Sequence, residues 1–332
     1  MKKISFVVGK DYQNNRIFNL SDKILNRDNC LYPYFLLKEG FQKRGYELIT
    51  SDLLSPAEAD LVIYNEMPKP FPLHINREKS YLLIFESELI RQDNWDQQKH
   101  QWFKKIFTWN DNFIDNNKYI KFNFPNSIIA TAPGVKDRNT LLTLISGNKT
   151  SIHTKELYSE RLKTIRWFEK YHPGDFHYYG VGWDYPFNVW FQKVFRKLKV
   201  LQFIPKRLSI CYKGRVDEKL PTLRKYKFAI CYENAKEIPG YITEKIFDCF
   251  FAGCIPVYWG PDNIENFIPE DCYIDRRKFK THEEMYRYLT HLSDEDIIAY
   301  QKRIDDFLNS EKAKFFSDES FAFTIIKNVL HE

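Results

Sequence analysis

The most reactive-looking stretch of this sequence is a charged pair at the start of a predicted helix. Thr243, Glu244 and Lys245 open a helix expected over about 243–252, with Gly253 as its natural stop. A helix N-terminus offers unpaired N–H groups and partial positive charge, so it favours a phosphate. The Lys245 ammonium would add the full charge that a departing nucleoside diphosphate needs. Glu244 could accept hydrogen bonds from sugar hydroxyls, although acids are also common at ordinary solvated helix starts.

A second acidic group follows the apolar run at 81–85, where Glu86 leaves a predicted strand. A carboxylate at the carboxyl end of a strand faces the ligand-binding edge of an open α/β sheet, where it can take a proton from an attacking hydroxyl. A helix-capping or salt-bridging acid would occupy the same place, and Glu88 is a rival base. Three weaker candidates for binding an acceptor lie on this side, Glu88, Asn94 and Asn110.

Both groups need a frame of strands and helices, which the hydrophobic pattern predicts. Short apolar runs alternate with longer amphipathic stretches, as is typical of α/β layering. A polar, turn-rich segment at 130–138 marks a domain boundary. We therefore predict two Rossmann-like α/β domains, at 1–135 and 136–315. A C-terminal helix at 316–332 would follow and could pack back on the first domain. The whole tail from 282 onward is expected to form three helical segments.

Composition narrows the class of protein. The 332 residues are 43% hydrophobic and 28% charged, which fits a globular protein with two cores. The net charge of +6 suits an anionic ligand or membrane surface, and no basic run interleaved with aromatics indicates nucleic-acid binding. Six cysteines lack metal-ligand spacing, so free thiols in a reducing compartment are expected. We found no signal peptide or spanning segment and expect a cytoplasmic protein.

One segment, 189–207, is both basic and amphipathic. Such a segment can lie on an anionic membrane surface, which would place the protein peripherally at the inner face of the membrane. The alternative is a surface helix whose apolar stripe faces the domain core.

The order YKF-x₄-EN-x₆-YxTEK at 226–245, followed by PVYWG, resembles the signature of the α1,3/α1,4-fucosyltransferases, glycosyltransferase family 10. The close resemblance covers about 50 residues, 226–275, with weaker similarity elsewhere. It implies a glycosyltransferase-B fold, with the two domains facing across a cleft. The implied reaction is inverting transfer of L-fucose from GDP-β-L-fucose to a hydroxyl, O3 or O4, of an acceptor glycan.

The resemblance also implies roles for particular residues. Donor-binding positions of the family fall on Asn234, Tyr241, Glu244 and Lys245, with Thr243 inside the same motif. The Phe-Glu-Ser sequence at 85–87 resembles the segment that supplies the catalytic base, which favours Glu86. A family arginine that contacts the diphosphate has two candidates here because the spacing differs, Arg215 and Arg207. A nearby glycine-rich turn would include Gly180.

No obligatory metal is expected, because Lys245 and the helix terminus can neutralise a diphosphate; stimulation by Mn²⁺ or Mg²⁺ is left open. Asp294-Glu295-Asp296 looks like a metal-binding DxD motif, but its position after Ser293 favours an acidic helix cap.

Two other functions remain open at this stage. One is the same fold and mechanism with a different nucleotide-deoxysugar donor, because a hydrophobic pocket rejects related sugars only weakly. The other is a catalytically silent glycan-binding or membrane-binding module, against which the intact Glu86, Glu244 and Lys245 argue. The acceptor would be an oligosaccharide or lipid-linked glycan, as in bacterial surface polysaccharide or protein glycosylation, and the sequence does not choose among them.

Overall fold

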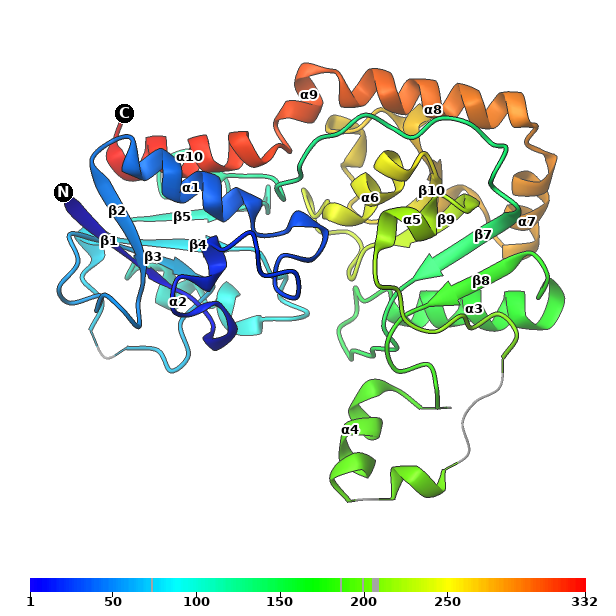
Figure 1. Ribbon diagram of the computed structural model, residues 1–332, viewed down its shortest axis with the longest axis horizontal. Helices are drawn as coiled ribbons and strands as arrows, with labels where there is room; N and C mark the ends of the chain where they lie inside the picture. The colour runs from blue at the N-terminus through cyan, green and yellow to red at the C-terminus, as the bar shows by residue number, and fades with distance from the viewer. Residues whose placement is uncertain (73, 186, 199, 205–208) are drawn as a thin grey trace. The chain divides into compact units, whose positions relative to one another are not determined.

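The computed structural model describes residues 1–72, 74–185, 187–198, 200–204 and 209–332. Figure 1 traces the chain, which divides into two compact units. Unit 1 comprises Met1–Ile128, Pro239–Tyr241 and Glu311–Glu332, and unit 2 comprises Ile129–Ile238 and Ile242–Ser310.

The domain boundaries differ from those predicted, because hydrogen bonds attach each connecting segment to one of the two units. The segment after Ile128 already belongs to unit 2, since the Thr131 hydroxyl donates to Phe250 O at 2.6 Å and Gly134 N donates to Gln301 Oε1 at 2.8 Å. The segment from Glu311 belongs to unit 1. The boundaries at 135 and 315 therefore move to 128 and 310.

The core of unit 1 is a parallel six-stranded sheet in the order β2-β1-β3-β4-β5-β6. Its central strand β4 is buried along its whole length, which explains why it appears in the sequence as a continuous apolar run. The strands are β1 (Lys2–Val7), β2 (Tyr46–Thr50), β3 (Leu61–Asn65), β4 (Ser80–Ile84), β5 (Lys105–Thr108) and β6 (Tyr119–Lys121).

Two helices of unit 1 lie side by side, α1 (Tyr32–Gln42) and α10 (Asp318–Leu330) (Figure 1). Gly40 allows their close approach, since a Cβ there would lie 2.3 Å from Ile326 Cδ1. The Tyr81 hydroxyl donates to Val329 O at 3.2 Å and ties α10 to the sheet. The short helices are α2 (Gln97–His100), α9 (Glu311–Lys314) and the 3-10 turns Lys10–Tyr12, Arg16–Phe18, Arg27–Asn29, Arg77–Lys79 and Gln92–Trp95.

Unit 2 contains a second parallel sheet, of five strands in the order β11-β10-β9-β7-β8. In register, Leu144 pairs with Ile230 and Tyr232 pairs with Trp259, so β7, β9 and β10 end at one edge of the sheet. Ligands of open α/β sheets bind at this edge. The strands are β7 (Thr140–Ile145), β8 (Phe176–Tyr179), β9 (Tyr226–Tyr232), β10 (Ile255–Trp259) and β11 (Ile274–Asp275).

The helices of unit 2 are α3 (Tyr158–Tyr171), α4 (Val189–Lys197), α5 (Lys219–Leu223), α6 (Glu244–Ala252), α7 (His282–His291) and α8 (Asp294–Leu308). Its 3-10 turns are Leu201–Phe203, Ile264–Asn266, Glu270–Cys272 and Arg276–Lys278. Four helices follow residue 281 rather than the three segments predicted, because α9 is a separate single turn.

The acidic triplet at the start of α8 is a helix cap, as predicted. Ser293 Oγ accepts from Asp296 N at 3.1 Å while Asp296 Oδ2 accepts from Ser293 N at 2.9 Å, which completes a capping box. Asp294 forms an ion pair with Lys227 at 2.8 Å. The triplet is thus accounted for by helix capping, and the described residues hold no group of three or more His, Cys, Asp or Glu side chains able to bind a metal.

Candidate active site

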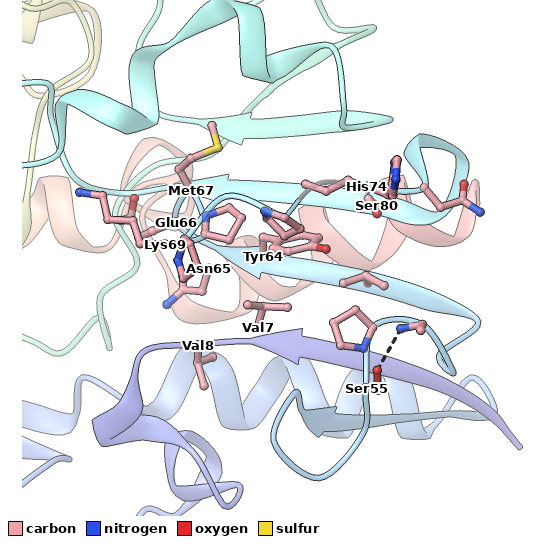
Figure 2. Close-up of a pocket in the computed structure, with 18 of the residues that line it drawn as sticks. Val7, Val8, Ser55, Tyr64, Asn65, Glu66, Met67, Lys69, His74 and Ser80 are labelled. Atoms are coloured by element: carbon pink, nitrogen blue, oxygen red, sulfur yellow. Dashed lines mark hydrogen bonds between the residues drawn. The ribbon is translucent and has the colours of Figure 1, made fainter.

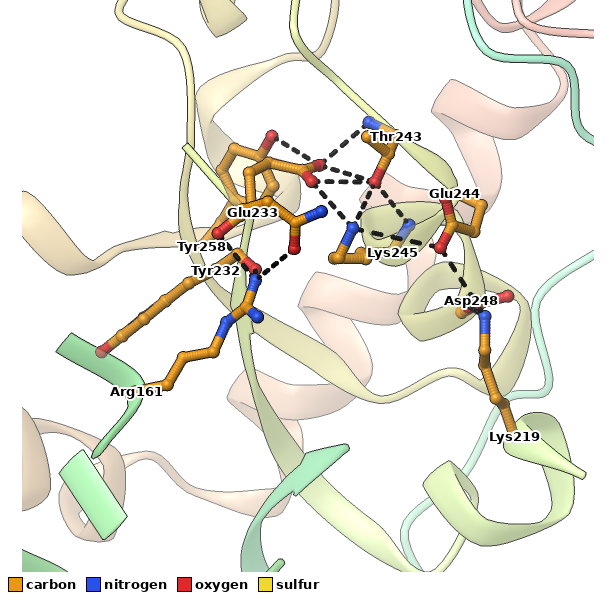
Figure 3. A network of polar contacts seen from close by, with 10 residues as sticks. Arg161, Lys219, Tyr232, Glu233, Thr243, Glu244, Lys245, Asp248 and Tyr258 are labelled. Carbon is orange, nitrogen blue, oxygen red and sulfur yellow. Dashed lines mark hydrogen bonds and ion pairs between the residues drawn. The ribbon is translucent and has the colours of Figure 1, made fainter. Parts of the chain in front are cut away.

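The polar network of unit 2 is built around Glu233, whose side chain is 0% exposed (Figure 3). This residue directly follows β9, at the edge where the strands end. Its carboxylate accepts hydrogen bonds from Thr243 N at 2.9 Å, Thr243 Oγ1 at 2.8 Å and the Tyr258 hydroxyl at 3.2 Å. The Lys245 ammonium pairs with it at 3.2 Å. A buried charge needs such partners, so Glu233 is the centre on which the site is assembled.

Thr243 is the N-cap of α6, and its hydroxyl accepts from Lys245 N at 3.4 Å. The same hydroxyl accepts from Lys245 Nζ at 3.0 Å. The helix therefore begins one residue later than predicted, at Glu244. Thr243 is 3% exposed, so its role in this structure is to cap α6 and hold the lysine rather than to contact a ligand.

The Glu244 side chain is 47% exposed and lies among cations. Lys219 Nζ is 3.8 Å from its carboxylate and Lys245 Nζ is 4.0 Å away. Desolvation would raise the pKa of Glu244, but the charges of Lys245 and Lys219 lower it to about 2. Glu244 is thus ionised and able to accept hydrogen bonds from hydroxyl groups. Lys219 is held from the other side by Asp248 at 2.7 Å.

Asn234, the next residue of the motif, is fixed by Arg161 of α3. The Arg161 Nη2 group donates to Tyr232 O at 2.6 Å, Glu233 O at 2.7 Å and Asn234 Oδ1 at 3.1 Å. Arg161 is 5% exposed, so a buried guanidinium supports the turn that carries Glu233 and Asn234. The structure brings Asn234, Thr243, Glu244 and Lys245 to one end of the unit 2 sheet.

A small cavity of about 100 Å³ lies beside this network, at the ends of β7 and β9. Three cationic side chains line it, together with the acids Glu244 and Asp248: Arg161, Lys219 and Lys245. Its volume is below the ~300 Å³ at the small end of ligand pockets, so it suits a phosphate-sized group rather than a whole nucleotide sugar. Its position at the N-terminus of α6 adds the partial positive charge of the helix.

Tyr241 is the motif residue that the structure separates from the others. It belongs to unit 1 with Pro239 and Gly240, and its ring is 2% exposed. The ring packs on Trp109 with centroids 4.6 Å apart and on Phe124 at 6.0 Å. The ring is thus enclosed by aromatic neighbours, and its contact with the donor stays a prediction.

The other donor candidates lie around β8. Gly180 has φ +137°, and a Cβ there would meet Ser146 O at 1.9 Å, so only glycine fits the turn. Gly180 N donates to Gly214 O at 2.9 Å, which places exposed Arg215 in the adjoining loop. Arg215 does not line the cationic cavity; Arg161 and Lys219 do. The rival candidate, Arg207, lies outside the described residues.

In unit 1, Glu86 follows β4, as expected for a group at the ligand-binding edge. Its backbone N donates to Glu66 Oε1 at 2.9 Å, and its carbonyl accepts from Trp95 Nε1 at 3.1 Å. The Trp109 indole donates to Phe85 O at 2.7 Å. The loop that carries Glu86 is therefore held from both sides.

The weaker acceptor candidates have other environments. Asn94 is 0% exposed and donates to Glu66 Oε2, while its Oδ1 accepts from Met67 N at 2.9 Å. Asn110 is 7% exposed, and its Oδ1 accepts from Asn112 N at 3.1 Å in a local turn. Both amides are thus engaged in shaping loops, and their contact with an acceptor stays a prediction. Glu88 is exposed.

A hollow of about 740 Å³ is lined by residues of unit 1. It lies where the connection from β3 to β4 has no α-helix to cover the sheet. Figure 2 shows Val7, Tyr64 and Glu66 around it. The hollow is large enough for a sugar, and Glu66 at its wall is next to the Glu86 loop.

Comparison with known proteins finds a family profile that matches part of the chain. The profile for the glycosyltransferase family 10 (fucosyltransferase) C-terminal domain matches residues 195–305, which include Glu233, Thr243 and Lys245. This segment of the chain is similar to that family. The resemblance predicted from the sequence is thus confirmed.

Curated fucosyltransferases match this chain over part of its length. An α-(1,4)-fucosyltransferase of Arabidopsis thaliana is 36% identical over 77 residues, 23% of this chain and 19% of the relative. The α-(1,3)-fucosyltransferase FucT of Helicobacter pylori is 32% identical over 108 residues, 32% of this chain and 22% of the relative. A mouse 4-galactosyl-N-acetylglucosaminide 3-alpha-L-fucosyltransferase 9 is 40% identical over 72 residues, 21% of this chain and 20% of the relative. The aligned part is about a fifth of each relative's length.

Solved structures confirm the predicted fold class of this chain. An α1,3-fucosyltransferase crystal structure aligns with a TM-score of 0.56 at 14% identity, covering 100% of this chain and 91% of that one. An α-glucosyltransferase in complex with UDP aligns with a TM-score of 0.57 at 12% identity, covering 100% of both chains. Both likenesses concern the fold alone, which is of the glycosyltransferase-B type.

Three residues of the site were missed by sequence reasoning. Glu233 had a visible signal, since it directly follows a buried strand within the family motif. Arg161 and Lys219 had none, because they lie 72 and 14 residues before Glu233 in the chain and reach the site only through the fold.

Proposed function

We propose that this chain is an inverting fucosyltransferase that moves L-fucose from GDP-β-L-fucose to a hydroxyl of an acceptor glycan. One observation carries the proposal: within the family 10 segment, buried Glu233 holds Lys245 at the N-terminus of α6, beside a cavity lined by Arg161 and Lys219. This arrangement suits a diphosphate leaving group, because cations and a helix terminus stabilise the charge that develops on it.

Inversion sets the requirements of the chemistry. The acceptor oxygen attacks the anomeric carbon as the bond to the phosphate oxygen breaks on the opposite face, so the β-linked donor gives an α-L-fucoside. A base must take the proton from the acceptor hydroxyl, and Glu86 is our candidate because it lies just after β4 on a firmly held loop. Lys245 would stabilise GDP as it departs.

The position that receives fucose is proposed as O3 or O4 of a sugar. The printed names of the relatives describe α-(1,3)- and α-(1,4)-fucosyltransferases, which supports these two positions. An oligosaccharide or lipid-linked glycan, such as a precursor of a bacterial surface polysaccharide, is the proposed acceptor class.

Calorimetric titration tests the donor. We expect binding of GDP and GDP-fucose, weaker binding of GDP-mannose, and no binding of UDP-glucose, with the same affinities in EDTA and in Mn²⁺. Affinity that is retained in EDTA follows from neutralisation of the diphosphate by Lys245 and its neighbouring cations. Preference for a uridine nucleotide would contradict the proposed donor, and another GDP- or dTDP-deoxysugar binding more tightly would favour a different donor. An activity lost in EDTA and restored by Mn²⁺ would contradict metal independence.

We also propose a peripheral membrane contact through the described part of 189–207. Large apolar side chains are exposed there, Trp190 (63%), Leu198 (64%) and Phe203 (78%) among them, and Lys193 and Arg196 accompany them. Apolar side chains can enter the headgroup region while the cations attract anionic lipid. No helix among the described residues is long and apolar enough to cross a membrane. The cytoplasmic location stays a prediction.

Vesicle co-sedimentation tests this contact. We expect binding to vesicles containing 30% phosphatidylglycerol (roughly the anionic content needed for such attraction) to weaken about 10-fold or more in W190S/F203S. The reason is the loss of two apolar side chains that would be buried in the headgroup region of the membrane. The matched control is F315S, since Phe315 is 63% exposed but belongs to unit 1. Equal binding by both variants would show that the segment does not contact the membrane.

A further inference from the structure

A buried carboxylate next to the Glu86 loop has no part in the reaction described so far. Glu66 follows β3, and its Oε1 accepts from Phe85 N at 3.1 Å and from Glu86 N at 2.9 Å. Its Oε2 accepts from the Asn94 amide. One side chain thus binds two successive backbone groups of the loop that carries Glu86.

The backbone of Glu66 is held in an unusual conformation to make these contacts. Its φ is +75°, in the left-handed region that residues other than glycine seldom adopt. Glu66 N donates to Leu83 O at 2.9 Å, which extends the pairing of β3 with β4 by one residue. Strained backbone of this kind is often found at functional sites, where the surrounding contacts compensate for its cost.

The partners of Glu66 are themselves fixed. Asn94 accepts from Met67 N through Oδ1, so its amide group cannot rotate without breaking that bond. His100 Nε2 lies 2.7 Å from Asn94 O and holds the same residue from the backbone side. The Asn94 amide therefore presents its N–H group, not its oxygen, to Glu66. The Glu66 Oε2 atom must act as the hydrogen-bond acceptor of this pair.

We propose that Glu66 is the positioning residue of the catalytic base: its carboxylate fixes the backbone at Phe85 and Glu86 and so aims the Glu86 side chain. This inference rests on the proposed function, because it concerns the residue that we expect to act as base. Glu66 also lines the 740 Å³ hollow (Figure 2), which would couple the loop to whatever occupies that hollow.

Glu66 works as an acceptor only when it is ionised. Burial raises the pKa of Glu66 from 4.5 to about 7, and the neighbouring charge of Glu86 adds to the rise, against the hydrogen bonds from the loop and Asn94. Besides Glu86, the titratable groups that act on it are Arg91 and, from α1, Tyr34. Protonation would turn one carboxylate oxygen into a donor facing the Asn94 amide and would loosen the loop.

Stability and turnover then respond to pH in opposite directions. Because the folded-state pKa lies above the unfolded value, the contribution of Glu66 to stability is present below pH 4.5 and is lost as the pH rises through about 7. Turnover should rise over the same interval as Glu66 ionises. A residue with only a structural role would show no such opposition.

The test uses E66Q with full-length protein. The glutamine oxygen can still accept from the two backbone groups, but its NH₂ group then faces the Asn94 NH₂ group, as in the protonated state, and this repulsion should weaken both backbone bonds. We expect kcat to fall about 10-fold with the KM for GDP-fucose within twofold, and the inflection of kcat near pH 7 to disappear. The matched control is E78Q, an exposed acid of the same unit, which should keep the wild-type profile.

Hydrogen exchange supplies a readout that needs no activity. In E66Q the amides of Phe85 and Glu86 should exchange at least 10-fold faster than in wild type or E78Q, while amides of β5 are unchanged. Unaltered exchange and an unaltered pH profile would overturn the proposal. A loss of kcat as large as that of E86Q would also overturn it, in favour of Glu66 acting on the acceptor directly. Absence of transfer by the wild type would instead contradict the proposed function and leave the exchange result standing.

Discussion

K245A is expected to bind GDP at least 10-fold more weakly than the wild type and to lose about 10²–10³ in kcat for fucosyl transfer. Lys245 lies in the first turn of α6, and removing one preorganised donor to developing negative charge costs about this much. Calorimetry with GDP and single-turnover kinetics with GDP-fucose measure the two effects separately.

The same substitution should also destabilise unit 2, because Glu233 would lose its cation while remaining buried. Breaking a buried ion pair costs about 3–5 kcal/mol, and we expect about 1–3 kcal/mol here, since Lys245 is 27% exposed and water can reach it. A double variant, K245M/E233Q, removes both charges. It should recover most of the stability in a thermal melt without recovering affinity for GDP.

The control is K227A, whose lysine is 28% exposed and pairs with Asp294 on the surface of the same unit. It should bind GDP as the wild type does. Wild-type affinity in K245A would mean that the lysine serves only as a counter-ion for Glu233. Binding regained in the double variant would mean that K245A had failed through misfolding.

Much of the framework was predictable because its strands are buried on both faces. β9 and β10 coincide with apolar runs of the sequence at 226–232 and 255–259, because every residue of these strands except Lys227 and Trp259 is buried. The start of α6 was predicted to within one residue, because a capping threonine precedes an amphipathic run that ends at glycine.

The contacts that shape the site were less predictable, because they join residues far apart in the chain. Tyr241 is two residues from Thr243, yet its ring packs on Trp109 of unit 1. Asn94 looked like a ligand-facing amide, but Glu66 lies 28 residues before it and engages that amide. No local pattern reports such pairings. Sequence therefore located the reactive residues better than it located the groups that hold them.

The second large effect on turnover is expected from the proposed base, Glu86, in unit 1. E86Q should lower kcat for fucosyl transfer by about 10²–10⁴, because an amide cannot take the proton from the acceptor hydroxyl. Binding of GDP should stay within twofold of wild type, since the side chain belongs to unit 1 while the cationic cavity is lined by unit 2. The two measurements together distinguish loss of the base from loss of the donor site.

Glutamine keeps the shape of Glu86, and the bonds of its backbone to Glu66 and Trp95 do not depend on the side chain. The fold should therefore survive, and the melting temperature checks this. E88Q is the matched control, because Glu88 is an exposed acid two residues away. If E86Q kept full turnover while E88Q lost it, the base would be Glu88. If both kept full turnover, the proton would have to leave by a group outside this loop, and Glu66, on the wall of the adjoining hollow, would be the next carboxylate to replace.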